Sequence, residues 1–483
     1  MNYRMIARVL GWILLIYAGL MLLPLAAGLW YHEAVWNFLI PMAISAALGG
    51  LLLLPRPRST SLVARDGFVI VGLGWIAISM IGALPFVLSG SIPHYLDALF
   101  ETASGLSTTG ATVVTDIDAM TAQHRGDMFW RLFTHWIGGM GVLVFLMAVL
   151  PMSGEHSMHI MRAEVPGPSV GKLVPRARQT ARVLYLIYIC LTLLEALLLR
   201  LGGMSFFDAL GHSFSTAGTG GFSTNAASIG GFHSSYIETV VTVFMFLFGV
   251  NFNLYFLILA GHWKDALKSE ELHWYLSIVF GSVLLICLGT SKIYGSIGEA
   301  VHQAFFNVGT IISTTGFGTI DFTQEWPEYC KWILVLLMLC GACAGSTGGG
   351  IKISRLMILT KSAMAELQQM VRPRSVTRIQ LDGKRVEHST VKAAATFFSV
   401  YIALLLFFSV LVSLDGVDIA TSFTAALSCL SNIGPGMTRA IGPAGSFAFF
   451  SHRTKLFLTV AMLMGRLEIY PILVLFSPHT WKR

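Results

Sequence analysis

Four short phrases decide the fold of this 483-residue chain: Ser107-Thr108-Thr109-Gly110, Ser215-Thr216-Ala217-Gly218, Ser313-Thr314-Thr315-Gly316 and Ser431-Asn432-Ile433-Gly434. Their glycines lie 108, 98 and 118 residues apart. Each phrase ends a moderately apolar stretch of roughly a dozen residues, which is too short to cross a membrane. One such phrase would carry no information, but four in register predict a chain built from four copies of one unit.

Long apolar windows flank every phrase. A bilayer-spanning helix needs about 20 apolar residues, and ten windows of this kind occur: 9–30, 36–54, 68–90, 129–150, 183–200, 238–262, 273–295, 330–361, 393–414 and 455–478. We therefore expect an all-α polytopic membrane protein. In this architecture, each of four units consists of a helix, a pore helix, a filter loop and a second helix. The four units surround one pore, and two N-terminal transmembrane helices precede them.

The same windows predict the division of the chain. Residues 1–67 hold the two N-terminal helices, and residues 68–151, 183–262, 273–361 and 393–483 hold pore repeats 1 to 4. The second helix of the third repeat is broken, because glycines interrupt the eighth window.

The composition excludes a soluble protein, since 55% of the residues are hydrophobic and only 12% are charged, against about 25% charged residues in an ordinary soluble domain. The net charge of +7 does not indicate a nucleic-acid partner, because the basic residues are scattered between apolar runs instead of sharing one face. Most of the 32 basic residues fall in the loops on one side. This bias predicts that both termini are cytoplasmic.

The repeated unit favours a cation. A short helix that enters from outside points its C-terminal carbonyls, the negative end of its dipole, into the membrane, and four such ends favour positive charge. Loop carbonyls can then replace the hydration shell of a monovalent ion. No phrase contains Asp or Glu, which disfavours a divalent-cation site. The alternative is that the glycines only permit close helix packing.

Three further motifs join the four phrases: Trp136-Ile137-Gly138-Gly139-Met140-Gly141, the glycine-rich run at 341–350, and Gly465-Arg466-Leu467-Glu468. Together they resemble the membrane subunit of the bacterial Trk potassium uptake system, in the Trk/Ktr/HKT superfamily, over nearly the whole chain. The resemblance implies that the four phrase glycines belong to a selectivity filter, where backbone carbonyls bind potassium. The expected filter residues are Thr108, Thr109, Gly110, Thr216, Ala217, Gly218, Thr314, Thr315, Gly316, Asn432, Ile433 and Gly434. Asn432 departs from the Ser-Thr pattern.

A gate is expected below the filter. The run at 341–350 contains five glycines in the middle of a window, so a straight helix should break there. Arg466 lies at a similar depth, where a permanent positive charge normally faces the bundle interior or water. The resemblance places both at a pore constriction, with Gly345, Ser346, Thr347, Gly348, Gly349 and Arg466 as the gate. Alternatively, Arg466 pairs with a carboxylate for packing. Lys352 is expected to snorkel at the cytoplasmic end of the broken helix.

The partners follow from the loops and from the resemblance. The basic loops at 152–182 and 362–392 set topology and attract anionic lipid. The resemblance adds a docking role for a peripheral nucleotide-binding regulatory subunit. It also implies a homodimer in the bacterial inner membrane, with K⁺ as substrate and no organic cofactor.

The leading hypothesis is potassium uptake through a selective, gated pore, either passive or coupled to protons or sodium. A sodium-coupled or sodium-permeable cation transporter remains an alternative within transport. A polytopic membrane enzyme is the alternative from another class. It is disfavoured because no intramembrane catalytic dyad or metal signature is evident in the sequence.

Overall fold

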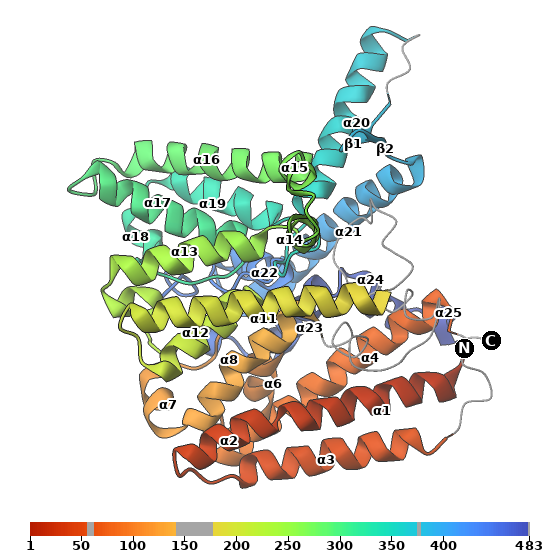
Figure 1. Ribbon diagram of the computed structural model, residues 1–483, viewed down its shortest axis with the longest axis vertical. Helices are drawn as coiled ribbons and strands as arrows, with labels where there is room; N and C mark the ends of the chain where they lie inside the picture. The colour runs from red at the N-terminus through yellow and green to blue at the C-terminus, as the bar shows by residue number, and fades with distance from the viewer. Residues whose placement is uncertain (56–61, 142–176, 374–377, 482–483) are drawn as a thin grey trace.

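The computed structural model describes residues 1–55, 62–141, 177–373 and 378–481 (Figure 1). Within them the chain is mostly helical, as its apolar windows predict. The exception is a small antiparallel pair of strands, β1 (Gln380–Leu381) and β2 (Lys384–Arg385). The predicted cytoplasmic loop at 152–182 lies mostly outside the described residues, as does the end of the first repeat at 142–151.

The N-terminal helices α1 (Tyr3–Leu20), α2 (Leu22–Trp30) and α3 (Trp36–Leu53) precede the repeats. A bend at Met21 divides the first predicted span into α1 and α2. Gly11 on α1 and Gly49 on α3 allow these helices to approach closely, since a Cβ on either would lie within 3.0 Å of the carbonyl oxygen of the other. Small residues at such crossings are typical of helix packing in membranes.

Four units of the predicted kind follow. The first contains α4 (Ala64–Gly82), α5 (Leu84–Ser89), α6 (Tyr95–Leu106), α7 (Ile117–Gln123) and α8 (Arg125–Met140). The second contains α11 (Ala177–Leu201), α12 (Phe206–Gly218), η1 (Ser228–Phe232), α13 (Ser235–Gly249) and α14 (Phe252–Leu259), with α15 (Trp263–Leu267) as a connector. The third contains α16 (Glu270–Thr290), α17 (Ile297–Ile312), α18 (Phe322–Glu325), α19 (Glu328–Cys340) and α20 (Ile353–Val371). The fourth contains α21 (His388–Ser413), α22 (Ile419–Ser431), η2 (Phe447–Phe449), α23 (His452–Arg466), α24 (Tyr470–Phe476) and α25 (Pro478–Trp481).

Only some of these helices are long enough to cross a membrane unbroken. Among the described residues, six helical segments have the necessary length and apolar composition: Tyr3–Trp30, Trp36–Leu53, Ala64–Ser89, Ala181–Leu201, Glu270–Thr290 and His388–Ser413. They are the two N-terminal spans and the first helix of every unit. The second helix of every unit fails the test because it is shorter or broken.

The breaks occur near equivalent places in all four units, whereas the sequence predicted only the third. Helix α8 ends at Gly141 (φ 83°), and α19 ends at Gly341 (φ 67°). Helix α13 is bent by 89° against α14. Helix α23 stops at Arg466, since the chain then turns through positive φ at Glu468 and Ile469. The gate predicted at one repeat is therefore surrounded by helix ends from the other three.

Both termini lie close together on one side of the molecule, and α20 projects from the body near that side, followed by the β1–β2 hairpin (Figure 1). The four short helices α6, α12, α17 and α22 lie inside the bundle, where non-helical backbone must be shielded from lipid.

Candidate ion filter and gate

Each of the four short helices stops at a residue in the left-handed conformation. These residues are Thr108 (φ 57°), Thr219 (φ 56°), Thr314 (φ 60°) and Asn432 (φ 57°). Two positions later, a glycine also has positive φ: Gly110 (80°), Gly221 (79°), Gly316 (84°) and Gly434 (102°). We call the segments 108–110, 219–221, 314–316 and 432–434 the central loops. Asn432 fits this pattern, because asparagine tolerates the left-handed region.

The backbone hydrogen bonds of the four central loops also match. The amide of the middle residue donates to the carbonyl five residues before it: Thr109 to Ser104 (2.8 Å), Gly220 to Ser215 (2.8 Å), Thr315 to Thr310 (2.9 Å) and Ile433 to Ser428 (3.0 Å). This bond closes the C-terminal end of each short helix. The equivalence of the loops therefore rests on dihedral angles and on hydrogen bonds.

These geometries correct the predicted register of the second repeat. Thr216, Ala217 and Gly218 still belong to helix α12, and the Thr216 hydroxyl donates to the carbonyl of His212, one turn earlier (2.9 Å). The left-handed residue and the glycine come three positions later than the Ser-Thr phrase suggested, at 219–221. The available signal was a shared Gly-Phe pair, since Gly221-Phe222 corresponds to Gly316-Phe317.

The central loops meet in a closed ring. A Cβ on Gly110 would lie within 3.0 Å of the carbonyl oxygen of Gly220 in the second loop. A Cβ on Gly221 would be similarly close to a carbonyl oxygen of the third loop, and a Cβ on Gly316 to one of the fourth loop. A Cβ on Gly434 would lie within 3.0 Å of the Thr109 carbonyl oxygen in the first loop. Each glycine thus lets the backbone of the next loop approach. The four glycines of this register also line one cavity of about 110 Å³.

The run after α19 lies directly beneath the ring. The amide of Gly349 donates to the Thr314 hydroxyl (2.7 Å), and a Cβ on Gly349 would overlap the carbonyl oxygen of Ser431. A Cβ on Gly348 would lie 2.7 Å from the carbonyl oxygen of Ser313. We call the segment 341–352 the gate segment. Its small residues let it lie against the third and fourth central loops.

Helix ends of the second and third units hold the gate segment from the side. The Cys343 amide donates to Gly249 (3.1 Å), and the Phe252 amide donates to Gly345 (3.1 Å). The buried Glu271 carboxylate accepts a hydrogen bond from the Ala344 amide (2.7 Å). The segment is therefore ordered by hydrogen bonds that its own helix, once broken, cannot supply.

Arg466 joins the gate segment to the first and fourth units. Its guanidinium donates to the carbonyl of Thr347 (2.8 Å) and to the carbonyls of Gly138 and Gly139 at the end of α8. The side chain is buried, with 7% of the residue exposed. The predicted gate residues 345–349 and Arg466 therefore lie together under the ring. Glu468 does not share a helical face with Arg466 and pairs with Arg355 of α20.

The position of Lys352 differs from the predicted one. It does not reach the cytoplasmic end of the helix but is buried in the gate segment, where its ammonium donates to the Gly348 carbonyl. Its positive φ of 79° turns the chain into α20. The lysine is held in the interior because carbonyls freed by the helix break can accept hydrogen bonds from its ammonium group.

Two buried charges near the ring were missed by the sequence reasoning. Glu101 on α6 and Arg131 on α8 form an ion pair of 2.6 Å, with side chains 0% and 1% exposed. The available signal was a charged residue inside an apolar run, which is costly in a membrane unless it is paired.

A model of the TrkH family, described as a cation transport protein, matches residues 35–483. The chain is 36% identical over 495 residues to the Trk system potassium uptake protein TrkH of Escherichia coli strain K12, with 100% of both chains covered. It is 34% identical over 488 residues to TrkG of the same strain, covering 100% of this chain and 99% of that protein. The crystal structure of the potassium transporter TrkH from Vibrio parahaemolyticus superimposes with a TM-score of 0.88 at 34% identity, with both chains fully covered.

Proposed function

Because the chain belongs to the TrkH family of cation transport proteins, we propose that it takes up potassium through a gated pore whose selective part is the ring of central loops. Its relatives with full-length similarity are named potassium uptake proteins. The protein is thus a multi-pass membrane transporter or channel and not an enzyme.

The observation that carries this proposal is the closed ring. Four short helices end at the ring, so the negative ends of their dipoles surround one axis and favour a cation there. Main-chain oxygens then take the place of the water shell of a monovalent ion. With Gly221 instead of Gly218 assigned to the filter, the four units have matching loop geometry. The proposed filter consists of residues 108–110, 219–221, 314–316 and 432–434.

The gate is proposed to be the gate segment together with Arg466. In the conformation described here, the segment lies against the third and fourth central loops, and Arg466 ties it to helix α8. A fixed guanidinium below a cation filter opposes cation passage. Movement of the gate segment away from the ring would break the bond between Arg466 and Thr347 and open the path.

The finer assignments also belong to the proposal. The protein lies in the inner membrane with both termini cytoplasmic and acts as a homodimer. A peripheral nucleotide-binding subunit docks on the side where α20 and the termini lie (Figure 1). Potassium is the transported substrate, and this chain binds no organic cofactor.

Fluxes from purified protein in lipid vesicles test the proposal. We expect rubidium, as a potassium analogue, to enter much faster than sodium, and Gly316→Ser to reduce that preference. Gly281→Ala is the matched control, because nothing lies within 4 Å of a Cβ at Gly281. Equal rubidium and sodium fluxes in the unmodified protein would favour the sodium-permeable alternative, and no flux with or without the regulatory subunit would refute transport by this path.

A further inference from the structure

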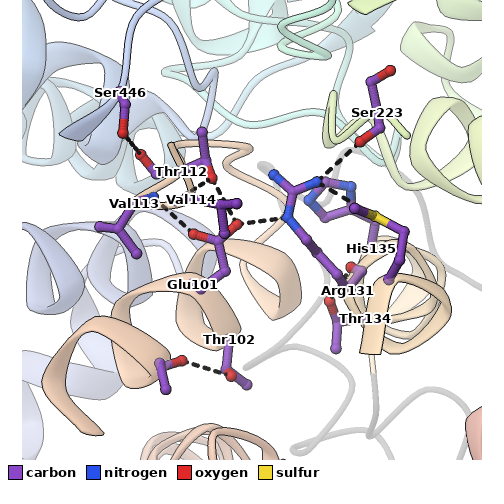
Figure 2. Close-up of polar contacts among 12 residues, drawn as sticks. Glu101, Thr102, Thr112, Val113, Val114, Arg131, Thr134, His135, Ser223 and Ser446 are labelled. Atoms are coloured by element: carbon purple, nitrogen blue, oxygen red, sulfur yellow. Dashed lines mark hydrogen bonds and ion pairs between the residues drawn. The ribbon is translucent and has the colours of Figure 1, made fainter. Parts of the chain in front are cut away.

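The buried Glu101–Arg131 pair lies beside the ring and joins parts of the chain that are far apart in sequence (Figure 2). Glu101 belongs to the short helix α6 of the first unit, and Arg131 belongs to α8, the second helix of that unit. Removing both charges from water is costly. The pair is therefore expected to be held in place by specific contacts, and those contacts lead to the central loops.

The Glu101 carboxylate binds the segment that leaves the first central loop. It accepts hydrogen bonds from the Thr112 hydroxyl (2.9 Å) and from the Val113 amide (2.8 Å). The Thr112 carbonyl in turn accepts bonds from the Ser446 hydroxyl (3.1 Å) and the Phe447 amide (2.8 Å) of the fourth unit. Figure 2 shows the chain of contacts from Ser446 through Thr112 to Glu101. One carboxylate thus fixes the backbone just beyond Gly110.

Arg131 binds the segment that leaves the second central loop. Its guanidinium donates to the Ser223 carbonyl (3.2 Å) and lies 3.6 Å from the centre of the Phe222 ring. These two residues directly follow Gly221. The guanidinium also lines the cavity outside the ring. A single side chain therefore links the exits of the first and second loops.

In the second unit, a histidine makes the contact that Glu101 makes in the first. The residue nine positions before the loop glycine is Glu101 in the first unit and His212 in the second. The His212 ring nitrogen Nε2 lies 2.9 Å from the Ser223 hydroxyl, just as Glu101 reaches Thr112. The third and fourth units have Asn307 and Ala425 at this position. A carboxylate at this position occurs only in the first unit, where it pairs with Arg131.

We propose that Glu101 and Arg131 are a positioning pair for ion selection. The pair holds the exits of the first and second central loops at a fixed separation. That separation sets the distance between loop carbonyls, on which discrimination between potassium and sodium depends. The inference rests on the proposed function, because it concerns the selectivity of the same ring.

Arg131→Lys separates this role from that of the charge alone. Lysine keeps the positive charge, but its single ammonium lacks the planar fork that serves Glu101, Ser223 and Phe222 together. A purely electrostatic role predicts unchanged selectivity in this variant. The positioning role predicts a fall in selectivity of about tenfold, the effect of losing one charge-assisted hydrogen bond.

The experiment uses the full-length protein in lipid vesicles and measures the ratio of rubidium to sodium uptake. Variants Arg131→Lys, Glu101→Gln and Thr112→Val are compared with Glu238→Gln. Glu238 of α13 also pairs with a short helix, contacting His302 of α17 at 2.6 Å, but this contact does not join the exits of two central loops. Elution profiles and thermal unfolding identify variants that do not fold.

We expect a reduced ratio in the first three variants and the wild-type ratio in Glu238→Gln. Thr112→Val removes only one hydroxyl, so it carries the test should the charge variants fail to fold. Wild-type ratios in Arg131→Lys and Thr112→Val would overturn the inference, as would an equal loss in Glu238→Gln. A wild-type protein without any preference for rubidium would instead contradict the proposed function.

Discussion

Arg466→Ala is the most informative perturbation of the gate. In the structure the guanidinium joins Thr347 of the gate segment to Gly138 and Gly139 of α8. The first of these bonds must break when the segment moves. A hydrogen bond to a charged group contributes about 1.5–3 kcal/mol, so its loss should raise the ratio of open to closed protein by roughly tenfold to 150-fold.

The assay is rubidium uptake into vesicles that contain the purified protein without any regulatory subunit. We expect Arg466→Ala to raise this basal uptake strongly. The basal uptake of Arg466→Lys should lie between the uptake of Arg466→Ala and that of the wild type, because lysine keeps the charge but cannot reach all three carbonyls at once. Thermal unfolding of each variant controls for misfolding. Basal uptake equal to that of the wild type in a folded Arg466→Ala protein would refute the gating role.

The corrected register predicts that Gly221→Ser reduces the rubidium-to-sodium uptake ratio, because the positive φ of Gly221 and its approach to Thr315 exclude a side chain. Thr216→Val on α12 should leave the ratio unchanged. The opposite pair of results would restore the original register. Gly349→Ala should raise basal rubidium uptake, since its Cβ would overlap the Ser431 carbonyl in the closed position, and a basal rate like that of Gly281→Ala would contradict this. Asp418→Ala should lower the free energy of unfolding by about 1 kcal/mol, because Asp418 caps α22. Hydrogen bonds from Thr421 lower the Asp418 pKa. The stabilisation should therefore be present above the pKa of Asp418 in the unfolded state and be lost as the pH falls through its pKa in the folded state. Identical unfolding curves for Asp418→Ala and the wild type at neutral pH would exclude this contribution.

Hydropathy and repetition were sufficient to predict the architecture. Apolar windows located the first helix of each unit, since those helical segments are long and apolar enough to cross a membrane. The ends of the second helices were harder to predict. Breaks near Gly249 and Arg466 depend on hydrogen-bond partners from other units, and such long-range partners leave no local pattern in the sequence.

The register of the second loop shows the limit of motif matching. Ser215-Thr216-Ala217-Gly218 resembles the other phrases, yet α12 continues through it and ends at Thr219. The length of a short helix is set by where its end meets the ring. Gly221 allows the backbone of the third loop to approach, and Gly220 leaves room for the His135 ring. Tertiary packing therefore overrode a local similarity.

Buried charges were the other feature that the sequence did not place. Lys352 was expected at the membrane surface, but the broken helix provides the Gly348 carbonyl as a partner in the interior. Glu101 and Arg131 lie 30 residues apart, and only the packing of α6 against α8 brings them together. Each partner is specified by the fold and not by spacing along the chain.

Anomalous diffraction from crystals grown in rubidium tests the central claim most directly. The account predicts rubidium density on the axis of the ring, surrounded by backbone oxygens from residues 108–110, 219–221, 314–316 and 432–434. Ordered rubidium bound elsewhere in the protein, with none between these four loops, would contradict it.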